Sequence, residues 1–178
     1  MKKRIFFIFL FLPLLLFSAN VDIAESRSKA LQEMQRWVGQ GIKYKWGVTD
    51  CSHYVQAGMG ASGLKLPTGS ASNGRYTQSI WNSNTNKIMP GQENLLKPGD
   101  LVFFYRSNAN GIGHTGMVYS TSDPSCGNGI SIIDTYTDGQ PPRIQCLSKH
   151  TGYVGAISHD EIIRANGHTP VNTDGTII

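Results

Sequence analysis

Cys51 is the residue of this sequence best placed to do chemistry, because a polar, turn-prone run leads into it and a helical pattern follows it. Val55 and Met59 stand four residues apart, as they would on one face of a helix. Thr49 or Asp50 can cap this helix by accepting hydrogen bonds from its free N–H groups. Cys51 then occupies the first turn, where the helix dipole favours the thiolate, the form that attacks a carbonyl carbon. The alternative is a buried cysteine that packs as a small apolar side chain.

His114 is the candidate base for that thiol. It follows a glycine-rich turn at 111–113 and opens the strand-like pattern of 114–120. A neutral imidazole at this place could take the thiol proton and later deliver it to a leaving amine. The alternative is a surface histidine beside a turn, because the sequence does not show that His114 and Cys51 touch.

Both residues lie within longer blocks of sequence. The blocks are Tyr-Lys-Trp-Gly at 44–47, Asp-Cys-Ser at 50–52, Leu-Lys-Pro-Gly-Asp-Leu-Val-Phe-Phe at 96–104 and Gly-His-Thr-Gly-Met-Val-Tyr at 113–119. In order and spacing, over about residues 29–157, they resemble the NlpC/P60 family of papain-like cysteine peptidases. The resemblance implies an α+β, papain-like domain whose N-terminal helices pack on a central antiparallel sheet. It also implies cleavage of peptidoglycan stem peptides, commonly between D-glutamate and a diamino acid.

The family uses a third polar residue to orient its histidine, and here the sequence departs from the family. The usual residue is a histidine in the next strand, whereas Asp134 stands at the matching position. A carboxylate bonded to an imidazole N–H can do the same work, because it fixes the tautomer and stabilises the imidazolium. The resemblance therefore predicts a catalytic set of Cys51, His114 and Asp134. The alternative for Asp134 is a water-facing residue at a sheet edge. His53 is a second departure, since the family commonly has glycine there.

The resemblance also implies substrate-binding roles close to the nucleophile. Tyr44 matches a family tyrosine near the cysteine and is a candidate for the oxyanion neighbourhood. Tyr44 and Asp50 also resemble the family's grip on the free amine of a stem peptide, and a carboxylate suits an ammonium group. The alternative for Asp50 is a helix cap only. Ser52 and Trp46 complete the predicted substrate-binding set, with packing in the core as the alternative for Trp46.

Residues 1–20 are typical of a secretory signal. A basic head precedes an apolar core too short to span a bilayer comfortably, and small residues follow. An uncleaved N-terminal anchor is the alternative. Removing the segment lowers the formal net charge from +4 to +1, because it holds three basic and no acidic residues. The basic character is therefore no nucleic-acid footprint. We expect export to the periplasm or the cell wall, without stable membrane association after cleavage.

The cysteine count bears on both a disulfide and a metal site. Cys126 and Cys146 flank a loop of turn residues and could form a disulfide worth roughly 3 kcal/mol, which would leave Cys51 free. Two unpaired thiols are the alternative. A zinc site from Cys51, His53 and His114 is also imaginable, but no paired spacing typical of zinc ligands supports it. The sequence therefore predicts no metal and no other cofactor.

Residues 21–165 are long enough for one α+β catalytic domain, and 166–178 are predicted to be a poorly ordered tail. The short separations between strands favour antiparallel pairing, and helices followed by strands fit helices packed on one sheet. A loop rich in Ser, Gly and Pro at 61–75 could wall the substrate site. The expected helices are 28–40 (capped by Ser28), 51–59 and 77–81, and the expected strands are 101–105, 114–120, 129–136 and 153–157.

These features favour an exported, monomeric cysteine peptidase that acts on peptidoglycan stem peptides. Two alternatives stay open at this point. One is a peptidoglycan amidase or acyltransferase on the same fold, and the other is a non-catalytic domain that binds the cell wall. The presence of both Cys51 and His114 argues against the non-catalytic domain, while the unusual Asp134 keeps it open.

Overall fold

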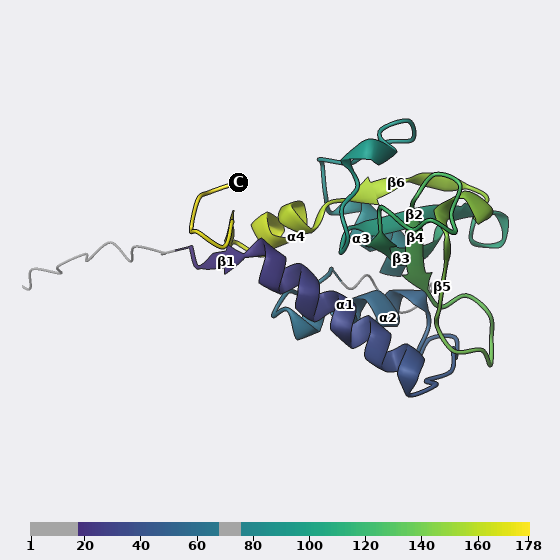
Figure 1. Cartoon of the computed structure of the whole chain (residues 1–178). Coiled ribbons are helices and arrows are strands. Elements are labelled where there is room, and N and C mark those ends of the chain that lie inside the picture. Colours follow the sequence, from purple (N-terminus) through teal and green to yellow (C-terminus); the bar gives the residue numbers. More distant parts are fainter. Residues whose placement is uncertain (1–17, 68–75) are drawn as a thin grey trace, which may run out of the picture.

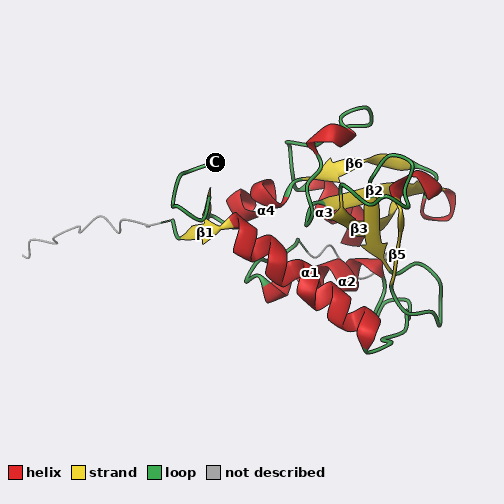
Figure 2. Cartoon of the chain, in the orientation of Figure 1, coloured by secondary structure: helices red, strands yellow, loops and turns green. Residues whose placement is uncertain are grey.

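The computed structural model describes residues 18–67 and 76–178. The predicted signal segment therefore lies outside the described residues except for its last three, and so do residues 68–75 of the predicted loop. Figures 1 and 2 show helices gathered on one side of the molecule and a twisted sheet on the other. This arrangement confirms the α+β class that the sequence predicts, with helices packed on an antiparallel sheet.

Two long helices form the layer that carries the nucleophile. Helix α1 spans Ile23–Gly39, and α2 spans Cys51–Ala61 and packs against it. The helix expected at 28–40 begins five residues earlier, because Asp22 caps it by accepting from the backbone N–H groups of Ala24 and Glu25. The short helix α3, Tyr76–Asn82, confirms the one expected at 77–81.

The sheet has five strands in the order β5-β4-β3-β2-β6, and all its neighbouring strands are antiparallel. Four strands match expectation, although β4 is shorter than predicted, and β5 was not expected. A four-residue strand that follows two prolines is too short to show a clear period of two. The bounds are Leu101–Arg106 for β2, Gly111–Ser120 for β3, Ser131–Asp134 for β4, Arg143–Cys146 for β5 and Tyr153–Ile157 for β6.

Both faces of the sheet are buried, which explains the continuous apolar run of β2. One face packs on the helices, with Phe103 and Ile133 facing Tyr54 and Met59. The other face lies under two short 3-10 turns, Glu93–Leu95 and Leu147–Lys149, and its side chains form a second core. The members of this second core are Leu96, Val102, Phe104, Val118, Ile130, Ile132, Leu147 and Ala156.

A buried polar joint fastens the helices to the start of β2. Arg27 of α1 pairs with Asp100 at 2.8 Å and with Asp160 of α4 at 2.7 Å; α4 spans His159–Ala165. Asp100 also accepts the backbone N–H of His159 at 2.9 Å, and the His159 ring lies 2.8 Å from the hydroxyl of Ser26. The aspartate of the 96–104 sequence block is therefore part of this structural joint.

The end of the chain differs from the expected disordered tail. Strand β7, Thr169–Val171, pairs in parallel with β1, Asn20–Asp22, near the start of the chain. Three residues whose partner lies at the other end of the chain leave no periodic signal in the sequence. Among the described helices, none is long and apolar enough to cross a membrane.

Candidate active site

Cys51 is the first residue of α2, and the cap that fixes this helix start is Asp50. The Oδ1 atom of Asp50 accepts the backbone N–H groups of Ser52 at 3.0 Å and His53 at 3.2 Å. Cys51 is only 4% exposed, and its thiol lies 4.0 Å from the hydroxyl of Thr77 on α3. The sequence prediction of a cysteine in the first turn of a helix is confirmed, and the thiol is both buried and free.

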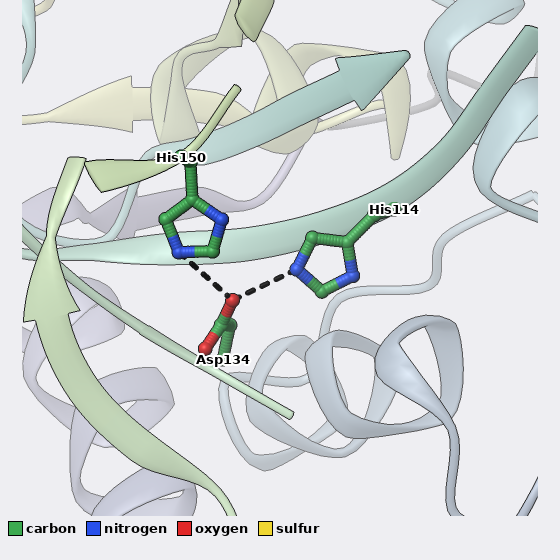
Figure 3. Close-up of side chains that lie close together, drawn as sticks. All are labelled: His114, Asp134 and His150. Carbon is green, nitrogen blue, oxygen red and sulfur yellow. Dashed lines mark hydrogen bonds and ion pairs between the residues drawn. The ribbon is translucent and has the colours of Figure 1, made fainter. Parts of the chain in front are cut away.

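His114 and Asp134 meet across two neighbouring strands. His114 lies on β3 and Asp134 ends β4, and both side chains are almost fully buried. Nε2 of His114 lies 2.8 Å from Oδ2 of Asp134, as Figure 3 shows. The other carboxylate oxygen, Oδ1, accepts a hydrogen bond of 2.9 Å from the Gln145 amide on β5. The carboxylate is thus held from two sides, and the solvent-facing alternative for Asp134 is wrong.

The thiol of Cys51 also acts on the His114 ring, through hydrogen bonding and charge. Burial lowers the pKa of His114, but hydrogen bonds and charge interactions with Asp134 and Cys51 outweigh it and raise the pKa to about 9. Because Nε2 is engaged by Asp134, Nδ1 is the ring nitrogen left for the thiol. The structure therefore brings Cys51, His114 and Asp134 together in one buried chain of contacts.

His150 is a member of this cluster that the sequence did not reveal. Its Nε2 lies 3.4 Å from Oδ2 of Asp134, and its ring stacks near that of His114, with centroids 5.9 Å apart and planes 19° apart. The centroid of the Phe104 ring lies 4.7 Å from that of the His150 ring, and this packing fixes the orientation of His150. His150 follows a 3-10 turn with no motif around it, so only the fold places it here.

The side chains of Asp50 and Ser52 are bonded to each other. The Ser52 hydroxyl donates to Oδ1 of Asp50 at 2.7 Å, and Nδ1 of His53 lies 3.0 Å from the same atom. Burial raises the pKa of Asp50, but hydrogen bonds from Ser52, His53 and Gly47 outweigh it and leave the pKa below its usual value. Asp50 is therefore an anionic cap, and within the described part of the chain its Oδ2 accepts only the Gly47 N–H, at 2.9 Å.

Tyr44 and Trp46, both predicted to bind substrate, differ in their exposure. Tyr44 is half-buried, and burial together with the charges of Cys51, Asp50 and Asp138 raises its pKa, so its phenol stays neutral. Its backbone exchanges hydrogen bonds with the turn at 139–140. Trp46 is 63% exposed, which rules out the core-packing alternative and leaves its ring free at the surface.

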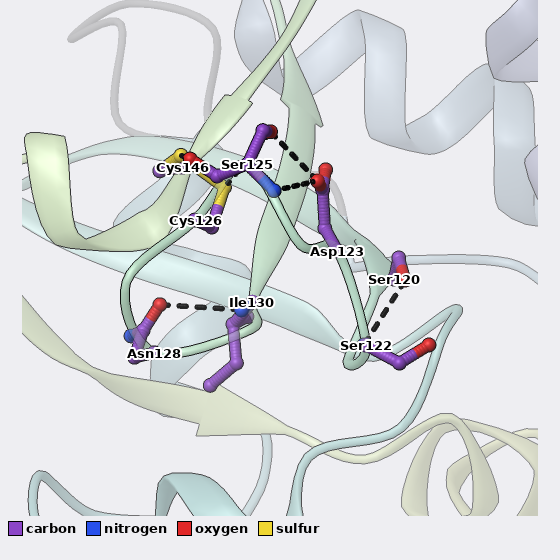
Figure 4. Close-up of a disulfide and its surroundings, with 8 residues drawn as sticks. All are labelled: Ser120, Ser122, Asp123, Ser125, Cys126, Asn128, Ile130 and Cys146. Carbon is purple, nitrogen blue, oxygen red and sulfur yellow. Dashed lines mark hydrogen bonds between the residues drawn. A yellow bond between two sulfur atoms is a disulfide. The ribbon is translucent and has the colours of Figure 1, made fainter.

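A disulfide joins Cys126 to Cys146, with an S–S distance of 2.10 Å and Cα atoms 5.3 Å apart. Figure 4 shows it closing a loop that is itself held by hydrogen bonds from Ser125 to Asp123. Cys146 is adjacent to Gln145, so the bridge fixes the strand that holds the Asp134 carboxylate. It leaves Cys51 as the free cysteine of the three in the sequence.

The zinc alternative built on Cys51, His53 and His114 finds no support in the structure. Within residues 18–67 and 76–178, the one group of His, Cys, Asp or Glu side chains close enough to share an ion is His114, Asp134 and His150. Their ligand atoms lie within 4.8 Å of one another. His53 turns to the Asp50 cap instead.

A free cysteine at a helix start, beside a histidine held by a carboxylate, is the arrangement used by papain-like cysteine hydrolases. The chain belongs to the NlpC/P60 family, whose model matches residues 41–153. Members of this family are in general cell-wall hydrolases of the peptidase type.

Solved structures of this family share the fold. NlpC1 and NlpC2 from Trichomonas vaginalis are similar with TM-scores of 0.56 and 0.57, at 16% and 17% identity over 75% of this chain. A protein described as similar to a lipoprotein of the NLP/P60 family, from Staphylococcus aureus subsp. aureus Mu50, gives 0.53 at 17% identity over 79% of this chain. The chain covers only 44%, 46% and 43% of these three structures, respectively. No curated protein sequence matches it.

Proposed function

We propose that this protein is an exported cysteine peptidase that hydrolyses amide bonds in peptidoglycan stem peptides. One observation carries the proposal. The buried imidazole of His114 lies 2.8 Å from the carboxylate of Asp134, and interactions with both Asp134 and the Cys51 thiol raise its pKa. A histidine between a thiol and a carboxylate can move a proton away from the one while the other stabilises the resulting charge.

The first half of the reaction forms an acyl-enzyme. The Cys51 proton passes to Nδ1 of His114, and Asp134 stabilises the imidazolium through Nε2–H. The thiolate attacks the amide carbon, and the backbone N–H of Cys51 is one donor to the developing oxyanion. The neutral phenol of Tyr44 is the candidate second donor. The raised pKa of His114 supports this step, because it favours the imidazolium that must accompany the thiolate.

The second half releases both products. Nδ1–H of His114 gives its proton to the leaving amine as the C–N bond breaks, which leaves a thioester on Cys51. His114 then takes a proton from water, and the hydroxide adds to the thioester carbon. The carboxylate product leaves, and the thiol regains its proton. Asp134 acts throughout as a positioning residue, since it contacts His114 and not the reacting atoms.

The substrate side of the proposal rests on charge and exposure. Asp50 is anionic beside the nucleophile, and its Oδ2 has capacity for one further donor, such as the ammonium group of a stem peptide. The exposed ring of Trp46 offers an apolar surface at the same rim. Ser52 acts through Asp50, because its hydroxyl is spent on that carboxylate. We propose the bond between D-glutamate and a diamino acid as the target.

The test is the product of digestion. Purified protein is incubated with defined muropeptides, and the fragments are identified by mass spectrometry. The proposal expects free D-glutamate carboxyl ends together with diamino-acid peptides, and no release by a Cys51→Ala variant. Cleavage between the glycan and its peptide would instead indicate an amidase, and transfer of the acyl group to an added amine an acyltransferase. No reaction with any wall fragment would contradict the enzymatic proposal.

A further inference from the structure

Three buried side chains of the site converge on one point in a way that the acyl-transfer chemistry does not require. His114, Asp134 and His150 come from three separate segments of the chain, and their nearest atoms are two Nε2 nitrogens and one carboxylate oxygen (Figure 3). Of the contacts among these three side chains, acyl transfer uses only the one between His114 and Asp134. The position of His150 is therefore unexplained by the proposed function.

The polar end of His150 is also unsatisfied. Its Nε2 atom is buried and has no hydrogen-bond partner among the described residues, although it lies 3.4 Å from Oδ2 of Asp134. A buried polar atom without a partner destabilises the fold, so such atoms in folded proteins call for an explanation. The Phe104 ring packs against the His150 ring in a tilted arrangement, with centroids 4.7 Å apart and planes 34° apart. The ring therefore presents a nitrogen to the carboxylate at ion-pair distance, but without a hydrogen bond.

The spacing of the three atoms suits a small cation. Zinc bound tetrahedrally at about 2.0–2.2 Å needs ligand atoms roughly 3.3 Å apart. The two nitrogens lie 2.8 Å and 3.4 Å from the shared oxygen, values on either side of that spacing. Two imidazoles and one carboxylate are ligands that Zn²⁺ binds well. The 44%-exposed Tyr136 contacts both rings edge-on, so solvent lies one side chain away.

We propose that His114, Asp134 and His150 form a binding site for a divalent transition-metal ion, with Zn²⁺ as the best match. The ion would take the lone pairs of both Nε2 atoms and one oxygen of Asp134, and solvent would complete its shell. The Gln145 amide, which donates to the other carboxylate oxygen, would hold Asp134 in place as a ligand.

An occupied site would switch off the acyl-transfer chemistry, a consequence that rests on the proposed function. A neutral imidazole carries one proton. With Nε2 bound to the metal, that proton sits on Nδ1 of His114, and this atom can no longer accept the proton of Cys51. Asp134 would also neutralise the ion and no longer stabilise an imidazolium. Metal binding and turnover would then exclude each other.

The direct test measures binding without substrate. Protein stripped with a chelator is titrated with Zn²⁺ by calorimetry, and we expect one ion per chain. His150→Gln removes one ligand but leaves the contacts among Cys51, His114 and Asp134, and it should weaken binding at least tenfold. His168→Gln is the matched control, because this histidine lies between α4 and β7 and should bind as the wild type does. Thermal melting of each variant checks its fold.

A Cys51→Ala variant separates this site from a simpler one. It should bind Zn²⁺ with unchanged affinity, and its Co²⁺ complex should match the wild-type spectrum, without a sulfur-to-metal charge-transfer band. Loss of binding in Cys51→Ala would place the metal on the Cys51–His114 pair and overturn the proposal. No binding by wild type, or full binding by a folded His150→Gln variant, would also overturn it. Because these readouts need no turnover, a failure of the peptidase proposal would leave the metal result intact.

Discussion

In the part of the chain that the structure describes, two buried clusters place a histidine beside an aspartate, and the pKa values of the two histidines are shifted in opposite directions. His159 lies in the joint of Arg27, Asp100 and Asp160, where burial and the charge of Arg27 lower its pKa to about 4. His114 lies between Cys51 and Asp134; burial lowers its pKa as well, yet its two partners raise it to about 9. Both rings are nearly inaccessible, being 0% and 3% exposed.

A structural histidine and a reactive one differ in the partners of the neighbouring carboxylate. The carboxylate of Asp100 is neutralised by Arg27 and bonds to the backbone of His159, so the ring stays neutral and accepts or donates within the fold. Among the described residues, the carboxylate of Asp134 pairs only with histidine side chains, and it bonds directly to the His114 ring. The thiol of Cys51 also acts on that ring and helps to raise its pKa. Burial alone therefore does not distinguish a structural histidine from a reactive one. The partners of the neighbouring carboxylate make that distinction.

The largest expected effect comes from the reactive cluster. Cys51→Ala should lower turnover of a stem peptide by at least about 10³-fold, because no nucleophile remains, while the melting temperature stays near that of the wild type. The matched variant in the structural cluster is Ser26→Ala, which removes the partner of the His159 ring. It should keep turnover within about twofold. Equal turnover by Cys51→Ala and wild type would remove the distinction between the clusters.

Breaking the structural cluster should affect stability instead. Arg27→Ala leaves Asp100 buried without its cation, and removal of one partner of a buried pair costs about 3–5 kcal/mol. Urea unfolding at neutral pH should show this loss, while turnover per folded molecule changes little. A variant with wild-type stability, or one that is stable but inactive, would contradict the structural role.

The two histidines should also give opposite pH dependences of stability. In the unfolded chain His159 binds a proton below about pH 6.5, whereas in the folded protein it stays neutral down to about pH 4. The free energy of unfolding should therefore fall as the pH drops from 6.5 to 4, by up to about 3 kcal/mol from this group. His159→Gln should flatten that slope and His168→Gln should not. An unchanged slope in His159→Gln would show that another group is responsible.

Substitution of Asp134 should lower turnover and leave the apparent substrate affinity little changed. Asp134→Asn keeps the size but can present a donor to the ring and permit the wrong tautomer, so we expect a decrease in kcat of about 10²-fold with KM little changed. Asp134→His, which restores the usual family residue, should retain more activity than Asp134→Ala. If Asp134→Ala turned over substrate like the wild type, the group that orients His114 would have to be another one.

The sequence could predict those parts of the site that local signals specify. Asp50 ahead of an apolar helical spacing marks the start of α2, so the place of Cys51 follows from capping alone. The strand of His114 follows from its glycine turn and apolar run. The antiparallel pairing follows from the short separations between strands, and the helix layer from helices preceding strands, in agreement with the family resemblance.

The remaining members of the site depend on contacts that no local pattern encodes. Gln145 reaches Asp134 because β5 lies at the edge of the sheet beside β4, and this strand has only four residues. His150 enters the cluster through a 3-10 turn that crosses the second core. The pairing of β7 with β1, which joins the two ends of the described chain, likewise has no local pattern that predicts it.

The charge state of His114 is the property that separates a reactive histidine from a structural one most directly. Nuclear magnetic resonance of imidazole-labelled protein can follow the titration of each histidine ring, with His114→Gln and His159→Gln variants to assign the signals. We expect His114 to be protonated through neutral pH and to titrate near 9, with a lower value in Asp134→Asn, while His159 stays neutral down to about pH 4. A His114 ring that is neutral at pH 7 would show that Cys51 and Asp134 do not raise its pKa.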